Sequence, residues 1–195
     1  VEAAQQGLIA GKGGRAKKAS TLDTDRGRIE RHIKPLLGAK LVRDLTRADV
    51  TKFQRDVASG KTAVVEKSAK LRGKAVVTGG KGTASRTVGL LGGILSFAVL
   101  SGVIEHNPAQ GVKRPADGRR ERRLTPEEYR KLGQALAAAE DAGEPWQAIA
   151  GAWLLALSPG RLSEITGLRW SMVDAAGHCI RYGDTKEGAS VRPVG

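Results

Sequence analysis

The sequence predicts a mainly α-helical protein with a small β-hairpin or sheet near its carboxyl end. Apolar residues recur at helical spacing through most of the chain, and turn residues divide them into separate helices. From Gly177 onward the pattern alternates around "TKEG", which is typical of a β-hairpin. Within the helical part, Asn107 to Arg123 is rich in Pro, Gly and charge without periodicity, as in an inter-domain linker. We therefore expect a helical domain followed by the beginning of an α+β domain.

The amino-terminal region predicts a tail and then a helix. Residues 1–18, with "GKGG" and "AKKAS", have the composition of a flexible basic tail. Ser20 or Thr21 can cap a helix that carries apolar residues on one face. Pro35 and Gly38 are expected to end this helix.

A second and a third helix follow in the same half. Thr46 can cap the second helix, Asp49 stands at its third position, and Gly60 ends it. Residues 61–82 have many Lys and Gly but no sustained period, so we expect a mobile basic loop, with a hairpin at "KAVVTGG" as an alternative. The run at 83–102 carries a broad apolar stripe and predicts a buried helix.

The second domain has a strong helix start. Thr125 is placed as the cap, Pro126 at the first helical position and Glu128 to complete a capping box. Two further helices are expected at about 145–157 and 161–168, and the first is apolar on nearly all sides, as in a core helix. The predicted domain limits are 1–18 (tail), 19–106 (helical domain), 107–123 (linker) and 124–195 (start of the second domain).

Positive charge is concentrated in three segments. The formal net charge is +13, and segments 1–18, 61–86 and 112–131 carry all of it, since the remaining residues sum to zero. Concentrated charge suits binding to a polyanion such as DNA, because neutralised phosphates release condensed counterions. Charged loops can also be simple solvated linkers, so charge alone leaves both readings open.

Several other classes of protein do not fit the sequence. Cys179 is the only cysteine, which excludes an internal disulfide framework and favours a reducing, cytoplasmic location. Apolar runs fall short of the roughly 20 residues that span a bilayer, so no membrane partner is expected. No cofactor or metal is expected, because the histidines are scattered and the Gly-rich stretches lack Walker spacing. Since the chain starts at Val1, we expect an internal piece of a longer product.

One motif combines a helix stop with an arginine. In "WLLALSPGRLSEITGLRW", Ser-Pro-Gly ends an apolar run, and Arg161 follows at the start of the next helix. A guanidinium beside a helix amino terminus offers fixed charge and bidentate donors to a phosphate. The alternative is an ion pair between Arg161 and Glu164, Glu140 or Asp141.

This motif and its context resemble the tyrosine recombinases, the phage integrase family. The match covers about residues 20 to 195: a helical region with "LTRADVTKF" and "NPAQGV", the arginine segment, and a Thr-Lys hairpin with a basic, proline-containing strand. The arginine segment comprises Arg161, Glu164, Leu168, Arg169, Trp170 and Asp174, and the hairpin comprises Thr185, Lys186, Arg192, Pro193 and Val194. The resemblance implies a helical, SAM-like core-binding domain followed by a truncated α+β catalytic domain.

The resemblance also implies an activity and roles for three residues. Full-length members cleave and rejoin DNA by transesterification through a 3′-phosphotyrosyl intermediate. Arg161 would stabilise charge on the phosphate oxygens and Lys186 would protonate the leaving 5′ oxygen, while Glu164 would orient its helix. The family's His-x-x-Arg motif and tyrosine nucleophile come after the lysine hairpin, so we expect them beyond Gly195 and expect this chain alone to be inactive.

The implied partner is a double-stranded DNA attachment site, bound by a full-length protein that is tetrameric on DNA and bacterial or phage-encoded. The expected DNA-binding residues are the basic side chains of the loop and the linker: Lys61, Lys67, Lys70, Arg72, Lys74, Lys81, Arg86, Lys113, Arg114, Arg119, Arg120, Arg122 and Arg123. A literal His-x-x-Arg, His178 to Arg181, precedes Lys186 and is interpreted as coincidence. The alternatives are a non-catalytic DNA-binding regulator, a decayed integrase remnant, or a basic protein-interaction module.

Overall fold

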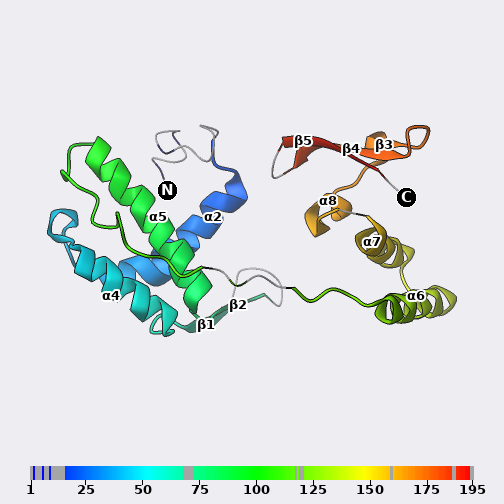
Figure 1. Cartoon of the computed structure of the whole chain (residues 1–195), viewed down its shortest axis with the longest axis horizontal. Coiled ribbons are helices and arrows are strands. Elements are labelled where there is room, and N and C mark those ends of the chain that lie inside the picture. The colour runs from blue at the N-terminus through cyan, green and yellow to red at the C-terminus, as the bar shows by residue number, and fades with distance from the viewer. Residues whose placement is uncertain are drawn as a thin grey trace. The chain divides into compact units, whose positions relative to one another are not determined.

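The structure is a computed structural model, and its contacts divide the chain into two compact units, Val1–Arg119 and Arg120–Gly195 (Figure 1). The described residues are Glu2, Gln6, Ile9, 16–67, 73–116, 118, 121–158, 160–185 and 188–193, without the side chain of Asp184. Most of the predicted tail therefore lies outside the described residues. Of its basic side chains, Lys17 and Lys18 are described, and Lys17 Nζ lies 2.8 Å from the Asp25 carboxylate.

The first unit consists of helices and one small hairpin. Its elements are α2 (Ala19–Arg28), the π-helical turn η2 (Ile29–Ile33), α3 (Lys34–Leu37), the 3-10 turn η3 (Val42–Asp44), α4 (Arg47–Ala58), β1 (Val64–Lys67), β2 (Lys74–Val77) and α5 (Lys81–Leu100). Two strands among so many helices agree with the mainly α class that the sequence predicts.

The core of the first unit lies between α4 and α5. Val50, Phe53 and Val57 recur at helical spacing along α4, and all three are fully buried. They belong to one apolar cluster with the α5 residues Val88 and Leu91, among others. The buried stripe predicted for this region is confirmed, because both helices turn the same periodic face inward.

By length and composition α5 could cross a membrane, so the expectation that every apolar run is too short is wrong for this helix. It is the one such helix in the part of the chain that the structure describes. In the first unit its buried face contributes to the core instead, through Ala84, Val88, Leu91 and Leu95.

The structure confirms the predicted start of α4 and contradicts the predicted cap of α2. The Thr46–Asp49 capping box is confirmed: Asp49 N–H donates to Thr46 Oγ1, and Thr46 N–H donates to the Asp49 carboxylate. The predicted cap at Ser20 or Thr21 is wrong, because α2 already begins at Ala19 and no side chain caps it.

The helix also continues through Pro35, where an end was expected. The π-helical turn η2 precedes this proline, and Lys34 N–H donates to Ile29 O across it. A wider turn leaves room for a residue that lacks an N–H and would clash within a regular helix.

The segment predicted as a mobile loop contains an antiparallel hairpin. Val64 pairs with Val77, Val65 with Val76, Glu66 with Ala75 and Lys67 with Lys74. Paired β-branched residues explain the strands, which the abundance of Lys and Gly obscured in the sequence. The alternative hairpin at "KAVVTGG" is therefore the better prediction, although residues 68–72 lie outside the described part.

Part of the predicted linker packs against the first unit. Asn107 Nδ2 donates to Gly92 O and to Ser96 Oγ, both at 2.9 Å, and Ala109 packs against the core. Gln54 Nε2 also donates to Lys113 O at 3.0 Å. The start of this segment is thus held on α4 and α5 by specific hydrogen bonds.

In its described residues, the second unit combines three α-helices with a three-stranded sheet. Its elements are α6 (Pro126–Asp141), α7 (Trp146–Leu157), α8 (Leu162–Thr166), the 3-10 turn η4 (Trp170–Met172), β3 (Val173–Asp174), β4 (Cys179–Thr185) and β5 (Gly188–Pro193). The strands are antiparallel in the order β3-β4-β5. The predicted hairpin is confirmed as β4 and β5, and the capping box at Thr125 and Glu128 is confirmed at the start of α6.

The prediction that α7 is a core helix is wrong in this unit. Ile149 is its one buried residue, whereas Trp146 is 71% exposed and Leu157 is 70% exposed. The helix contacts α6 and α8, and these do not surround it. An apolar composition on all sides predicts burial only when neighbours cover every side.

Candidate functional site

The sequence-predicted Arg161 and Glu164 lie in one cluster with Arg192, which comes from β5. Glu164 Oε2 accepts hydrogen bonds from Arg161 N–H at 2.8 Å and from Arg192 Nη1 at 2.7 Å. Glu164 Oε1 accepts from Arg161 Nη1 at 3.0 Å and from Arg192 Nη2 at 3.3 Å. One carboxylate therefore holds two guanidinium groups from separate elements.

Burial differs strongly across this cluster. The side chain of Glu164 is 8% exposed, that of Arg192 is 18% exposed, and that of Arg161 is 48% exposed. The hydrogen bonds from Arg192, then from the Arg161 backbone, lower the pKa of Glu164 from its ordinary 4.5 to about 2, against the opposing effect of desolvation. Glu164 is thus ionised at neutral pH, and Arg161 presents the accessible positive charge of the cluster.

Local packing explains how α8 carries this arrangement. A Cβ on Gly160 would lie 2.5 Å from Ile165 Cδ1 and 2.9 Å from Ile165 Cγ1, so any other residue at this position would require the buried Ile165 side chain to shift. Glu164, one residue before Ile165, accepts a hydrogen bond from the N–H of Arg161, the cap residue that precedes α8. Gly160 therefore has a packing role immediately before α8.

The hairpin is attached to the same cluster through Arg192. Ile180 on β4 pairs with Arg192 on β5, and the guanidinium of Arg192 lies 5.0 Å from the centroid of the Tyr182 ring. Tyr182 itself is buried. A cation over an aromatic face and a bidentate carboxylate contact together fix the orientation of Arg192.

Of the two predicted catalytic residues, the structure describes Arg161 but not Lys186. Arg161 precedes α8 as its cap residue, and α8 has five residues, so the predicted helix 161–168 is shorter than expected. The ion pair between Arg161 and Glu164, an alternative from the sequence, is present. Lys186 lies outside the described residues; next to it, Thr185 Oγ1 donates to Gly188 O at 2.6 Å and closes the hairpin end. Both catalytic roles remain predictions.

A second carboxylate–arginine pair lies on the sheet. Asp174 accepts hydrogen bonds from Arg181 Nη2 at 2.7 Å and from Gly177 N–H at 2.8 Å. The bond from Arg181, first, lowers the pKa of Asp174. His178 stands in the intervening turn with a φ of 46°. Arg181 thus braces the β3–β4 turn, and the interpretation of His178 to Arg181 as a coincidental motif stays a prediction.

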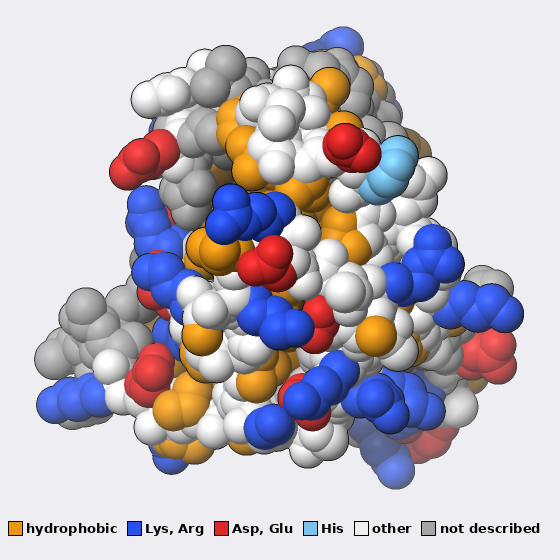
Figure 2. Space-filling view, turned by 90° about the vertical axis from the view of Figure 1, so that its left-hand side faces the viewer, with side chains coloured by type: hydrophobic (Ala, Val, Ile, Leu, Met, Phe, Trp, Pro, Cys, Tyr) orange, Lys and Arg blue, Asp and Glu red, His pale blue; other side chains and the backbone are white. Residues whose placement is uncertain are grey.

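Most of the predicted DNA-binding residues lie on the surface. Those that the structure describes are all exposed: Lys61, Lys67, Lys74, Lys81, Arg86, Lys113, Arg114, Arg122 and Arg123. Lys70, Arg72, Arg119 and Arg120 lie outside the described residues. Figure 2 shows Lys and Arg side chains along much of the face that it draws, with Asp and Glu scattered between them. Some positive charge is locally balanced, since Lys61 lies 3.2 Å from Asp56 and Arg122 pairs with Glu128.

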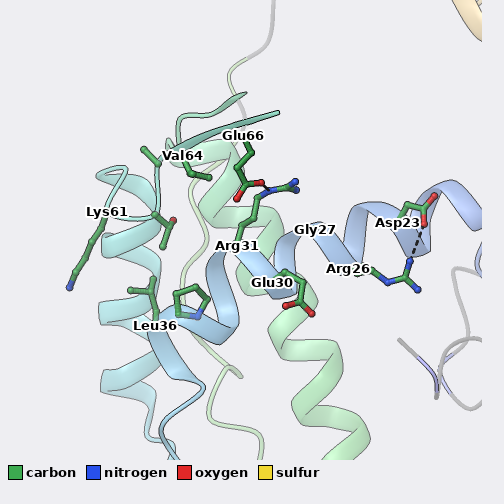
Figure 3. A pocket seen from close by; sticks show the side chains of 12 residues that line it. Asp23, Arg26, Gly27, Glu30, Arg31, Leu36, Lys61, Val64 and Glu66 are labelled. Carbon is green, nitrogen blue, oxygen red and sulfur yellow. Dashed lines mark hydrogen bonds and ion pairs between the residues drawn. The ribbon is translucent and has the colours of Figure 1, made fainter. Parts of the chain in front are cut away.

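An open groove of about 750 Å³ lies between α2, η2 and the start of β1 (Figure 3). Two contacts cross its margin: Arg31 Nε donates to Glu66 Oε2 at 3.2 Å, and a hydrogen bond of 2.6 Å joins His32 Nδ1 and Thr62 Oγ1. Burial, then the charges of Arg31 and Arg28, lower the pKa of His32. These contacts attach the β1–β2 hairpin to the helices.

No cluster of three or more His, Cys, Asp or Glu suited to a metal ion occurs among the described residues. The charged side chains that line the groove and those of the Glu164 cluster instead form acid–base ion pairs.

No protein-family model and no curated protein matches the chain. Solved structures do match. A lambda integrase(75–356) dimer bound to a COC′ core site has a TM-score of 0.69 at 17% identity, covering 100% of this chain and 59% of that one. This chain has a lambda-integrase-like fold. A lambda integrase tetramer bound to a Holliday junction gives 0.64 at 19% identity, covering 91% of this chain and 45% of that one.

A further lambda integrase dimer on a COC′ core site matches with a TM-score of 0.65, 18% identity, and coverage of 91% of this chain and 43% of that chain. The chain therefore spans about half the length of the lambda integrase chains it resembles. Short sequence motifs predicted a tyrosine-recombinase-like fold. The structural likeness, which covers 91–100% of this chain, supports that fold.

Arg192 is the residue of the Glu164 cluster to which the sequence analysis gave no role. It appeared only as part of the resemblance, although the alternation of β5 offered a signal. Residues Gly188, Ser190 and Arg192 share the less exposed face of that strand, and an arginine on such a face needs a carboxylate partner. The partner, Glu164, lies 28 positions earlier, which strand periodicity cannot reveal.

Proposed function

We propose that this chain is the DNA-binding part of an integrase-like, tyrosine-type DNA strand transferase. The observation that carries the proposal is the fold shared over 91–100% of the chain with lambda integrase structures, all of them bound to DNA. The exposed basic side chains in segments 61–86 and 112–131 supply the charge that duplex binding requires. Phosphate contacts would dominate affinity, and base contacts would add sequence preference.

Within this proposal Arg161 binds the phosphate at which strands are exchanged. Its half-exposed guanidinium can turn one edge to a phosphate while Glu164 keeps the other edge oriented, and Arg192 keeps Glu164 ionised. A preorganised cation stabilises the charge that develops on phosphate oxygens during transesterification. Lys186 would act as general acid from the hairpin, and a tyrosine nucleophile would be supplied by the full-length protein, which we propose to be tetrameric on DNA.

Duplex binding is the experiment that tests the proposal. The 195-residue chain is titrated with a fluorescent DNA duplex over a series of salt concentrations, with polyglutamate of matched charge as a second ligand. We expect the logarithm of the affinity to fall linearly with the logarithm of salt, with a slope of about −5 or steeper, corresponding to six or more phosphates. Salt-independent binding, or equal affinity for polyglutamate, would favour a protein-interaction module and remove the proposal.

The catalytic part of the proposal needs a different readout. The full-length protein, incubated with a nicked duplex that traps covalent intermediates, should form a DNA–protein adduct, and Arg161→Ala should lower its yield by about 100-fold or more. A full-length protein that binds duplex DNA without forming an adduct would instead be the non-catalytic regulator or remnant.

A further inference from the structure

The β1–β2 hairpin has two chemically different faces. In its register, the pairs Val64–Val77 and Glu66–Ala75 form one face. On this face Val64, Val77 and Ala75 are half-buried, and Glu66 accepts a hydrogen bond from Arg31 of η2. The other face carries the pairs Val65–Val76 and Lys67–Lys74. Val65 is 59% exposed, Val76 is 58% exposed, and both lysines are exposed. We call this second face the Val-Lys face.

The hairpin is held on the helical unit by contacts at its base and on its other face. The Arg31–Glu66 ion pair and the His32–Thr62 hydrogen bond connect it to η2, as Figure 3 shows for Arg31 and Glu66. After β2, Gly79 approaches α4 so closely that a Cβ there would lie 2.4 Å from Val57 O. With both margins attached, the Val-Lys face is presented in one orientation, which lowers the entropic cost of binding.

We propose that the Val-Lys face enters the major groove of duplex DNA, an inference that rests on the function proposed above. A two-stranded antiparallel ribbon fits the width of that groove, and apolar side chains can contact the thymine methyl group there. Val65 and Val76 contact the base edges, while Lys67 and Lys74 bind phosphates on the groove walls. In Figure 1 the hairpin projects beyond the helices of its unit.

The charges on the hairpin select DNA over a second copy of the chain as the occupant. Lys67 and Lys74 stand directly opposite each other, and like charges in such a pair destabilise a hairpin. A polyanion relieves this repulsion, whereas pairing with another Val-Lys face would bring four lysines together. The face itself carries no acidic residue among its described positions, because Glu66 lies on the other face and is bound to Arg31.

The test combines a protein variant with a DNA variant. Val65→Ser/Val76→Ser removes the apolar contacts, and Val42→Ser/Val103→Ser, at two exposed valines of the same unit, is the matched control. Each protein is titrated with alternating poly(dA–dT) and with poly(dA–dU), which lacks the thymine methyl group. Circular dichroism and thermal melts confirm that each variant folds as the wild type does.

The wild type and the control are expected to bind poly(dA–dT) about 3- to 10-fold more tightly than poly(dA–dU), because the methyl groups add buried apolar area. Val65→Ser/Val76→Ser should abolish this difference. Lys67→Gln/Lys74→Gln should keep the difference but reduce the slope of affinity against salt by about 2.

Three results would overturn the inference, each in a distinct way. If the Val65→Ser/Val76→Ser variant binds both polymers as the wild type does, the hairpin does not read the groove, although duplex binding stands. If it changes the sedimentation of the free chain and leaves DNA affinity intact, a second copy covers the face. If the wild type binds neither polymer, the proposed function falls together with the inference.

Discussion

Glu164 is the residue that organises the candidate site of the second unit. Its carboxylate binds Arg161 through the backbone and the side chain and binds Arg192 through two nitrogens. The neighbouring sequence suggested the first contact, because Glu164 stands three positions after Arg161. The second contact could not be predicted, because it depends on how the sheet packs against α8.

Replacement of this carboxylate should change the acid sensitivity of the protein. Because the pKa of Glu164 falls from 4.5 to about 2 on folding, its contribution to stability is complete above pH 4.5 and is lost as the pH falls toward 2. Glu164→Gln should therefore be less stable than the wild type at pH 7 and lose less stability between pH 4.5 and 2. Thermal melts across this range measure the effect, with the exposed Glu105→Gln as control; identical pH profiles for all three proteins would contradict it.

The phosphate-binding role of Arg161 predicts a change in salt dependence. Arg161→Ala should reduce the slope of duplex affinity against salt by about 1, as expected for one lost phosphate contact. Arg181→Ala is the matched control, because Arg181 is also a largely exposed arginine of this unit paired with a carboxylate. Equal slopes for the two variants would show that Arg161 does not contact phosphate in the complex.

At the scale of elements, the sequence predicted best where signals are local. The capping boxes at Thr46 and Thr125 depend on residues three positions apart, and both are present. The continuation of the first helix through Pro35 was missed, because a π-helical turn accommodates the proline and has no local sequence signature. The β1–β2 hairpin was only an alternative, since its valines lie among glycines and lysines.

The two outcomes at helix starts give a paired stability test. Thr46→Ala removes the hydroxyl that accepts from Asp49 N–H and should lower the free energy of unfolding by about 1 kcal/mol. Ser20→Ala should have little effect, because Ser20 does not cap α2. Urea unfolding monitored by circular dichroism measures both, and Thr46→Ser should retain wild-type stability. A larger loss for Ser20→Ala than for Thr46→Ala would contradict these cap assignments.

Buried His32 predicts a second pH effect, located at the hairpin. Its pKa lies below 6.5 because of burial and of Arg31 and Arg28, so its stabilising effect is present above pH 6.5 and is lost as the pH falls through the lowered pKa. Hydrogen exchange of the backbone amides in β1 and β2 should accelerate as the pH falls from 7 to 5, after correction for intrinsic rates. His32→Gln should flatten this dependence; an unchanged dependence in the variant would show that another group is responsible.

At the scale of the whole molecule, composition and resemblance predicted the mainly α class, and the structural likeness to lambda integrase supports the fold. The sequence predicted which segments carry exposed positive charge, because most lysines and arginines lie on protein surfaces. The exposure of α7 was not readable, because an apolar helix is buried only as far as its neighbours extend. Arg192 was not readable either, because a contact across 28 positions requires the folded sheet.

The central claim, that this chain binds duplex DNA through a localised basic surface, is tested most directly by neutralising that surface. Lys67, Lys74 and Lys81 are changed together to Gln. In a control of equal net charge, Arg26, Lys34 and Arg43, which lie outside the basic segments and pair with Asp23, Glu30 and Asp44, are changed to Gln. Affinity for one duplex is then measured against salt. We predict that the first variant loses about 2.7 from the slope while the control keeps the wild-type slope to within about 1; equal slopes in the two variants would contradict the claim.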